Sequence, residues 1–173
     1  KNYKRKKYIV YAGTFASWVE YDLIDLLCKY FVNEKIILIG KPAKDISYDF
    51  IKKFEKKNKN LIILNQMDKK DLHKFLLKCS VAIIPYNPSL LHIKNCSPSK
   101  IMDYLGCGLP VVSSNIPYSI NHKFVKVANN HKEFINQIKK ALLFKESKRS
   151  SLIKYSLDNN WDNKVWDLMK KVK

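Results

Sequence analysis

The residues best able to do chemistry lie together in the segment 96–114. This segment predicts a loop, a short helix that begins near Ser97, a glycine turn and a buried strand over 110–113. Lys100 lies early in that helix, where backbone N–H groups and the helix dipole favour an anion. Asp103 follows on a neighbouring part of the same face. A cation and a carboxylate placed in this way could bind a diphosphate and the hydroxyls of an attached ribose.

A structural role for the same side chains stays open. Lys100 and Asp103 could form an exposed i, i+3 ion pair, which contributes only tenths of a kcal/mol. However, a lysine near a helix N-terminus opposes the helix dipole, and this favours an anionic ligand. Ser97 and Ser99 could cap the helix, donate to a phosphate, or do both.

The segment also resembles a known motif. Its residues are similar to the nucleotide-sugar-binding signature of GT-B glycosyltransferases of group 1, in the C-terminal domain: Ser97-Pro98-x-Lys100-x-x-Asp103-Tyr104-Leu105-x-x-Gly108-x-Pro110-Val111-Val112. Further landmarks of these enzymes follow in the expected order: Tyr11-Ala-Gly-Thr14, Leu38-Ile-Gly40, Val81-Ala-Ile-Ile-Pro85 and Trp161. The resemblance therefore covers nearly the whole chain.

The resemblance implies a role for each loop of the site. Lys100 would stabilise the diphosphate leaving group, and the carboxylate of Asp103, where relatives usually carry Glu, would bind the donor ribose. The donor-binding residues implied in this way are Asp103, Ser97, Pro98, Ser99, Gly13, Thr14, Lys44 and Gln66. Lys41 is a second candidate for the diphosphate, and the loop 65–67 would hold the base. A plain strand-to-helix turn would explain Gly13 equally well.

One departure from the family's pattern limits what the resemblance implies. Many relatives carry a Glu eight positions before the ribose-binding carboxylate, and here that position is Asn95. The retaining pattern of these enzymes is therefore not implied. His92 and Asn95, both in the loop before the signature, are further candidates for ligand contact. No Asp-x-Asp motif is present, which agrees with a family that usually works without metal. We expect no metal and no cofactor beyond the donor, a UDP- or GDP-sugar.

The rest of the chain alternates apolar strands with amphipathic helices. This alternation predicts a three-layer α/β/α Rossmann-like domain with a parallel sheet of about six strands. The expected strands are 8–12, 35–39, 61–64, 80–84, 110–113 and 124–127. The expected helices are about 18–31, 48–57, 68–78, 132–144, 147–156 and a last one from near 160, with Trp161 and Trp166 as packing anchors. Ligands of such sheets bind at the carboxyl ends of the strands.

Length and composition bound the remaining possibilities. The 173 residues fit one domain, no apolar run approaches a membrane span, and the first residues do not read as a signal peptide. The four cysteines lack zinc or disulfide spacing, as expected of free thiols in a cytoplasmic protein. The chain starts without methionine, and the resemblance implies an excised domain. The acceptor site and any general base would lie in an N-terminal domain that is absent, so this fragment alone should transfer nothing.

The net charge of +18 raises the question of polyanion binding. Only Arg5 and Arg149 are arginine, and the lysines are spread along the chain, which favours a solvated surface over nucleic-acid recognition. Contact with anionic lipid at the inner face of the cytoplasmic membrane remains open. Two alternatives to a glycosyltransferase also remain open: another Rossmann-like nucleotide or sugar-phosphate enzyme, and a basic non-catalytic module that binds lipid or nucleic acid.

Overall fold

The chain folds around one parallel sheet that is covered by helices on both faces. The computed structural model describes residues 5–159, 165 and 169–170. The strands are β1 (Tyr8–Ala12), β2 (Lys35–Ile39), β3 (Leu61–Leu64), β4 (Val81–Ile84), β5 (Val111–Ser114) and β6 (Val125–Ala128). All pairings are parallel, in the order β3-β2-β1-β4-β5-β6. The predicted Rossmann-like, three-layer fold is confirmed.

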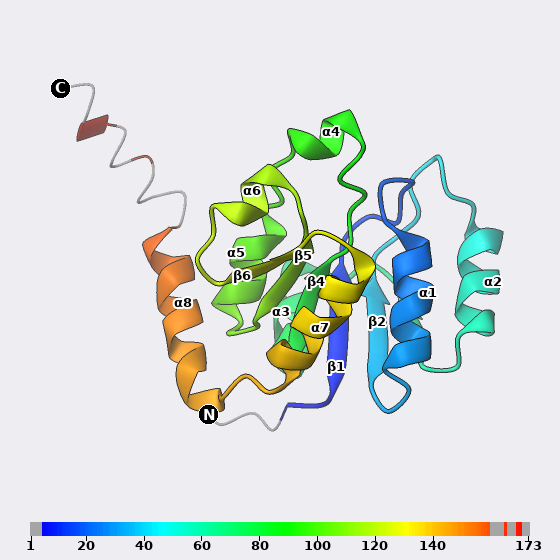
Figure 1. Cartoon of the computed structure of the whole chain (residues 1–173), viewed down its shortest axis with the longest axis horizontal. Helices are drawn as coiled ribbons and strands as arrows, with labels where there is room; N and C mark the ends of the chain where they lie inside the picture. The colour runs from blue at the N-terminus through cyan, green and yellow to red at the C-terminus, as the bar shows by residue number, and fades with distance from the viewer. Residues whose placement is uncertain (1–4, 160–164, 166–168, 171–173) are drawn as a thin grey trace.

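The helices fill the two outer layers (Figure 1). They are α1 (Tyr21–Tyr30), α2 (Tyr48–Lys57), α3 (Lys69–Leu76), α4 (Leu91–Lys94), α5 (Lys100–Gly106), α6 (Pro117–Ile120), α7 (His131–Leu142), the 3₁₀ turn η1 (Glu146–Lys148) and α8 (Arg149–Asp158). In Figure 1, α1 and α7 lie in front of the sheet, and α3 and α5 lie behind it. The loops that follow the carboxyl ends of the strands gather at the top of this view.

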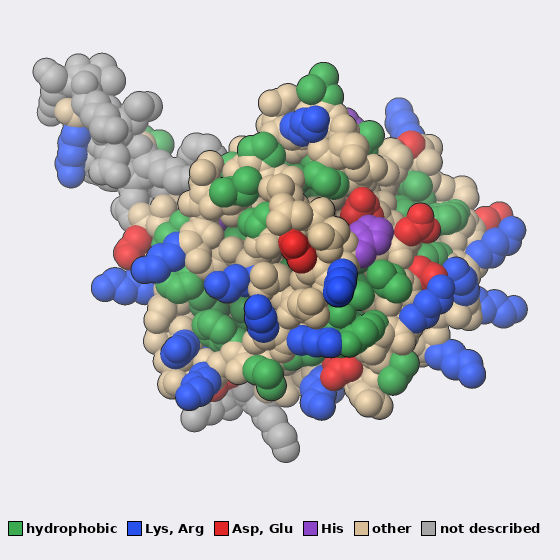
Figure 2. All heavy atoms as spheres, in the orientation of Figure 1, with side chains coloured by type: hydrophobic (Ala, Val, Ile, Leu, Met, Phe, Trp, Pro, Cys, Tyr) green, Lys and Arg blue, Asp and Glu red, His purple; other side chains and the backbone are tan. Residues whose placement is uncertain are grey.

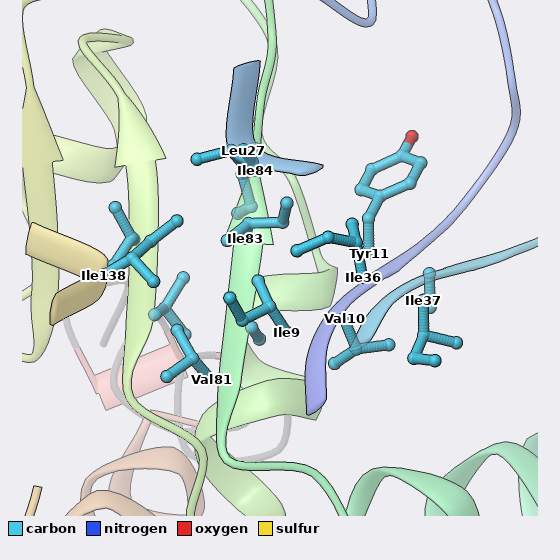
Figure 3. Close-up of a cluster of buried hydrophobic side chains, with 14 of the residues drawn as sticks. Ile9, Val10, Tyr11, Leu27, Ile36, Ile37, Val81, Ile83, Ile84 and Ile138 are labelled. Atoms are coloured by element: carbon cyan, nitrogen blue, oxygen red, sulfur yellow. The ribbon is translucent and has the colours of Figure 1, made fainter. Parts of the chain in front are cut away.

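The strands are continuous apolar runs because both faces of the sheet are covered. Ile9, Val10, Ile36 and Ile83 are fully buried. Figure 3 shows these side chains around the central strands, together with Leu27 from α1 and Ile138 from α7. Burial of aliphatic side chains at about 25 cal/mol per Å² is the main stabilising contribution to such a sheet.

Several predicted boundaries match the structure, and others need correction. The bounds of β1, β2, β3 and α2 are as predicted, and Asp68 caps α3 by accepting a hydrogen bond from the Asp71 N–H at 2.8 Å. Helix α1 begins at Tyr21 rather than at residue 18. The four-residue helices α4 and α6 were not predicted. The helix expected from near residue 160, with Trp161 and Trp166, lies outside the described residues.

The largest correction concerns α5, which begins at Lys100 and not near Ser97. The carbonyls of Pro98 and Ser99 accept i+3 bonds from the N–H groups of Ile101 and Met102, so a tight turn precedes the helix. A residue before proline is disfavoured in the helical region, which keeps Ser97 outside the helix. Lys100 is therefore the first residue of the helix rather than one turn inside it.

Candidate functional site

The order of the strands creates a crevice between β1 and β4. From β1 the chain continues outward on one side of the sheet, through β2 to β3. It then returns to the other side of β1 and continues outward through β4 and β5 to β6. Open sheets of this kind bind ligands outside the carboxyl ends of the strands at such a switch point. Strands β1 and β4 pair only at Ile9 with Val81 and at Val10 with Ala82, so they separate before their carboxyl ends.

The side chain of Tyr104 fills the space where these strands separate. Its hydroxyl accepts a hydrogen bond from the Ala12 N–H at 2.8 Å and donates to the Ala12 carbonyl at 3.2 Å. Tyr104 is 1% exposed, as expected for a core residue. Burial raises the pKa of its phenol well above the usual value, so the hydroxyl stays protonated. These bonds attach α5 to the end of β1 and so position the neighbouring Asp103 and Lys100.

The ammonium group of Lys100 lies at the switch point, held between two tyrosines. Its Nζ donates a hydrogen bond to the hydroxyl of Tyr86 and lies 5.0 Å from the centre of that ring. The ring of Tyr11, at the end of β1, is 5.6 Å away. Burial, with a contribution from Tyr86, raises the pKa of Tyr11 far above its usual value, so Tyr11 does not become an anion that could pair with Lys100. Such cation–π contacts orient a cation without neutralising its charge.

The charge on Lys100 has no carboxylate partner in the part of the chain that the structure describes. The ion pair with Asp103 that the sequence left open is therefore not formed. Asp103 is exposed on α5. Cys107, one turn later on the same face, contacts His73 of α3, with Sγ and Nδ1 3.4 Å apart. The Asp103 face of α5 thus looks toward α3.

Gly13 lets the lysine reach this position. A Cβ atom on Gly13 would lie 2.8 Å from the Tyr11 hydroxyl and 3.1 Å from Cε of Lys100. Facing it, a Cβ on Gly40 would lie 2.0 Å from the Gly13 carbonyl oxygen, so only glycine fits there. The Gly13 N–H donates to the Ile39 carbonyl at 2.9 Å, which holds the loops after β1 and β2 together.

A pocket of about 270 Å³ opens beside Gly13 at the ends of β1, β2 and β3. Its lining includes the predicted residues Gly13, Thr14 and Gln66, and also Lys41, which was the second candidate for the diphosphate. Leu72 of α3 closes one side, on the helix that the Asp103 face of α5 approaches. This volume is close to the smallest volumes of small-molecule sites in proteins. It suits a planar base with part of a ribose.

The residues before α5 line a different and smaller pocket. Ser97 and Pro98 face a space of about 210 Å³ that also includes Trp18, Tyr86 and His92. Trp18 and His92 meet edge to face, with ring centres 5.8 Å apart. Tyr86 lines this pocket and accepts from Lys100, while Gly13 of the larger pocket lies close to Cε of the same lysine, so Lys100 lies near one lining residue of each pocket.

Four residues considered in the sequence analysis lie away from the contacts of Lys100. Ser99 is the residue before α5, but its side chain makes no capping bond, and Ser97 lies outside the cap position, so the capping role of both is wrong. Lys44 is exposed and lines neither pocket. Asn95 ends α4 and donates its side-chain amide to the Leu91 carbonyl at 3.2 Å. None of these four side chains makes a described hydrogen bond or ion pair with Lys100.

Sequence reasoning did not identify the tyrosines that hold the lysine. Tyr11 and Tyr86 each lie at or just beyond the end of a buried strand, where they read as core residues. Their proximity to Lys100 depends on the pairing of β1 with β4, which no local pattern reveals. One signal could have identified the two tyrosines: each lies near the carboxyl end of a strand that borders the switch point.

Among the described residues, no group of three or more His, Cys, Asp and Glu side chains converges as a metal site. Their four cysteines are free. No described helix is both long enough and apolar enough to cross a membrane.

Comparison with known proteins identifies related folds. The catalytic domain of cholesterol-α-glucosyltransferase from Helicobacter pylori superposes with a TM-score of 0.66 at 17% identity, covering 88% of this chain and 98% of that one. Anabaena HepE, solved with UDP and glucose, gives 0.64 at 16% identity, covering 88% of this chain and 42% of that one. TarM from S. aureus, solved with UDP among its ligands, gives 0.69 at 13% identity, covering 96% and 35%.

These identities are low enough that the structures establish the fold alone. The chain spans less than half the length of HepE and of TarM. No curated protein matches the sequence. A family model, however, matches residues 1–158, almost the whole described part of the chain and including the signature around Lys100 and Asp103. The chain belongs to the family of group 1 glycosyl transferases.

Proposed function

We propose that this chain is the donor-binding part of a glycosyltransferase that transfers a sugar from a nucleoside diphosphate sugar. The observation that carries the proposal is the ammonium of Lys100, held at the switch point with no carboxylate partner among the described residues. Beside it, Gly13 exposes backbone and opens a pocket whose lining includes Thr14 and Gln66. A diphosphate at the lysine would place its nucleoside in that pocket.

The proposed chemistry follows from the charge that develops during transfer. As the bond between the sugar and the diphosphate breaks, negative charge accumulates on the leaving diphosphate. The positioned ammonium of Lys100 stabilises that charge without reorganising, because Tyr86 already holds it in place. Asp103, an exposed carboxylate on α5, would accept hydrogen bonds from the ribose hydroxyls. The backbone around Gln66 would hold the base.

The finer parts of the proposal concern the whole enzyme. The donor would be a UDP- or GDP-sugar, used without metal, and UDP in the solved structures of HepE and TarM supports the first choice. The acceptor would be a cell-envelope glycan or a lipid-linked sugar, held by an N-terminal domain that also supplies any general base. Without that domain this chain would bind donor and transfer nothing. We place the enzyme in the cytoplasm, in peripheral contact with the membrane.

The test is calorimetric titration of the chain with UDP, GDP, ADP and the free nucleosides. Loss of one charge-assisted hydrogen bond contributes about 1.5–3 kcal/mol, so Lys100→Met should weaken diphosphate binding roughly ten- to a hundredfold. The nucleoside should bind this variant as it binds the parent chain, because the lysine contacts phosphate alone. Asp103→Ala should weaken nucleoside and diphosphate by a similar factor.

The matched control is Lys56→Met, which removes an exposed lysine from α2, away from both pockets. If Lys56→Met and Lys100→Met weaken UDP equally, binding is general charge attraction and the proposal fails. Raising the salt to 0.3 M provides a second criterion. A basic surface that binds any polyanion would lose affinity for all three diphosphates steeply with salt, whereas a specific pocket would keep its preference for one base.

A further inference from the structure

A second pocket, outside the donor site, lies at the opposite end of the sheet. It is a groove of about 330 Å³ between the end of α7, the start of α8 and the residues that precede β6. Its apolar surface includes Phe124, Phe144 and Leu152. Four lysines complete the lining: Lys123, Lys126, Lys140 and Lys148. We call this feature the lysine groove.

The charges around the lysine groove are of one sign. All four lysines are exposed, and none forms an ion pair with another described residue. No carboxylate of the described residues is part of the lining. The acidic residue nearest in sequence, Glu146, accepts from Arg149 at 2.7 Å and from Arg5 at 3.4 Å, so its charge is already paired. The groove therefore combines an apolar interior with an unneutralised positive rim.

The surrounding surface has the same character. Leu143, between two groove residues in sequence, is 82% exposed at the end of α7. Lys139 and Lys145, on either side along the chain, are also exposed. Figure 2 shows Lys and Arg side chains among hydrophobic ones over the lower left of this face, the region that the end of α7 and the start of α8 occupy in Figure 1. An exposed apolar surface within a positive ring marks an interaction site.

The position of the groove leaves it open while a donor is bound. Phe124 precedes β6, and the last turn of α7 returns to the same level, so the groove lies at the amino-terminal end of the strands. The Lys100 site lies at their carboxyl ends. A ligand in the groove and a donor at Lys100 would therefore not compete for space.

We propose that the lysine groove binds anionic lipid at a membrane surface. The four lysines would contact the lipid phosphates, and Leu143, Phe124 and Phe144 would enter the boundary between headgroups and acyl chains. Each lysine near an anionic bilayer and each buried apolar side chain adds to such binding. A soluble polyanion would satisfy the lysines but would leave the apolar groove and Leu143 without a partner. This assigns a surface to the membrane contact of the proposed function, and it does not depend on donor binding.

The experiment is sedimentation of the chain with vesicles of phosphatidylcholine alone or with one third phosphatidylglycerol, at 0.1 M salt. We expect binding to the anionic vesicles only. Replacing Lys126 and Lys140 by Gln should lower the partition coefficient about 25-fold, since each lysine contributes roughly fivefold. Leu143→Ser should lower the partition coefficient about tenfold, because the variant loses the free energy gained when a leucine side chain is buried in the membrane interface. Both changes are on exposed side chains and should leave thermal stability and UDP binding unchanged.

Matched controls separate the groove from the general charge of the chain. Lys52 and Lys53 on α2, replaced by Gln, remove the same charge from another face, and Leu91→Ser removes an exposed leucine from the opposite end of the sheet. Losses confined to the groove variants support the proposal. Equal losses for the α2 pair would overturn it in favour of diffuse attraction. Full binding by Leu143→Ser would also overturn it, because binding would then rest on charge alone and the apolar side chains would not enter the membrane. UDP titration of the same samples reports on the donor site separately.

Discussion

At the scale of single residues, Lys100 occupies its position because residues distant in sequence leave room for it. Gly13 lacks the side chain that would block Cε, and Tyr86 accepts from the ammonium. Tyr11 is buried and stays neutral, so the positive charge is held in place without being cancelled. A preorganised and uncompensated cation of this kind is suited to an anion that arrives and leaves, such as a diphosphate.

Tyr104 offers a residue-scale prediction about the structure that supports this cation. Tyr104→Phe keeps the ring but removes the only described bonds that its hydroxyl makes, to the N–H and carbonyl of Ala12. Leaving buried backbone groups without partners costs about 1–3 kcal/mol, so we expect the free energy of unfolding in urea to fall by about 2 kcal/mol. Tyr48→Phe, at a 65% exposed position, is the control and should change it little. An unchanged urea midpoint for Tyr104→Phe would mean that water replaces the hydroxyl at Ala12.

At the scale of elements, Asp25 links α1 to the end of α2. Its carboxylate lies 2.6 Å from Nζ of Lys29 and 2.8 Å from Nζ of Lys57, and the residue is 8% exposed. The hydrogen bonds from Lys29 and Lys57 lower its pKa from 3.8 to about 2. Because the folded state favours the ionised form, this contribution to stability is complete above about pH 5. It is lost as the pH falls toward 2.

We therefore expect Asp25→Asn to remove part of the acid sensitivity of the fold. Near pH 7 the variant should lose about 1–2 kcal/mol of unfolding free energy, and near pH 2 its stability should approach that of the parent chain. Urea unfolding at pH 7, 4 and 2.5 measures the difference. Asp49→Asn, which removes an exposed carboxylate of α2 that forms no ion pair with another described residue, is the control and should change stability much less than Asp25→Asn at pH 7. A constant difference for Asp25→Asn would contradict the linkage.

The sequence predicted those elements whose signals are local. Strand β2 and helix α2 match at both ends because a buried run and an amphipathic period each stop at clear boundary residues. The predicted start of α1 was wrong because the residues before Tyr21 pair with the segment after β4. Val19 bridges to Tyr86, and the Glu20 N–H donates to the Pro85 carbonyl. Such contacts form only once β4 is beside β1, so no pattern within residues 18–31 reveals them.

Part of the candidate site could also be predicted, namely the part that follows from the order of strands and loops. Gly13, Thr14 and Gln66 follow strand ends, and parallel strands bring their ends to one edge, so their shared pocket follows from topology. Lys44 was expected at this edge as well, but Lys41 lines the pocket instead, since it directly follows Gly40 and Lys44 lies farther along an exposed loop. The pairing of Lys100 with Tyr86 rather than Asp103 depends on side-chain packing across two strands.

At the scale of the whole molecule, the two ends of the sheet differ in the side chains that they carry. The carboxyl ends carry the cation, the base-sized pocket and the turns that need glycine, while the amino-terminal end carries the lysine groove. A single sheet thus separates the Lys100 cation from the lysine groove. A molecule of net charge +18 can keep both because the lysines lie mostly on the surface, where solvent and salt screen them.

That charge predicts how the fold responds to salt. With 33 basic and 15 acidic residues, repulsion among lysines opposes the compact state, and the unfolded chain relieves it by expanding. Raising NaCl from 10 mM to 0.15 M shortens the screening length from about 30 Å to about 8 Å, so we expect the melting temperature to rise by roughly 3 °C at pH 7. The chain with Lys52, Lys53, Lys56 and Lys59 replaced by Gln should start higher and respond less. A melting temperature that falls with salt would instead show that ion pairs such as Asp25 with Lys57 outweigh the repulsion.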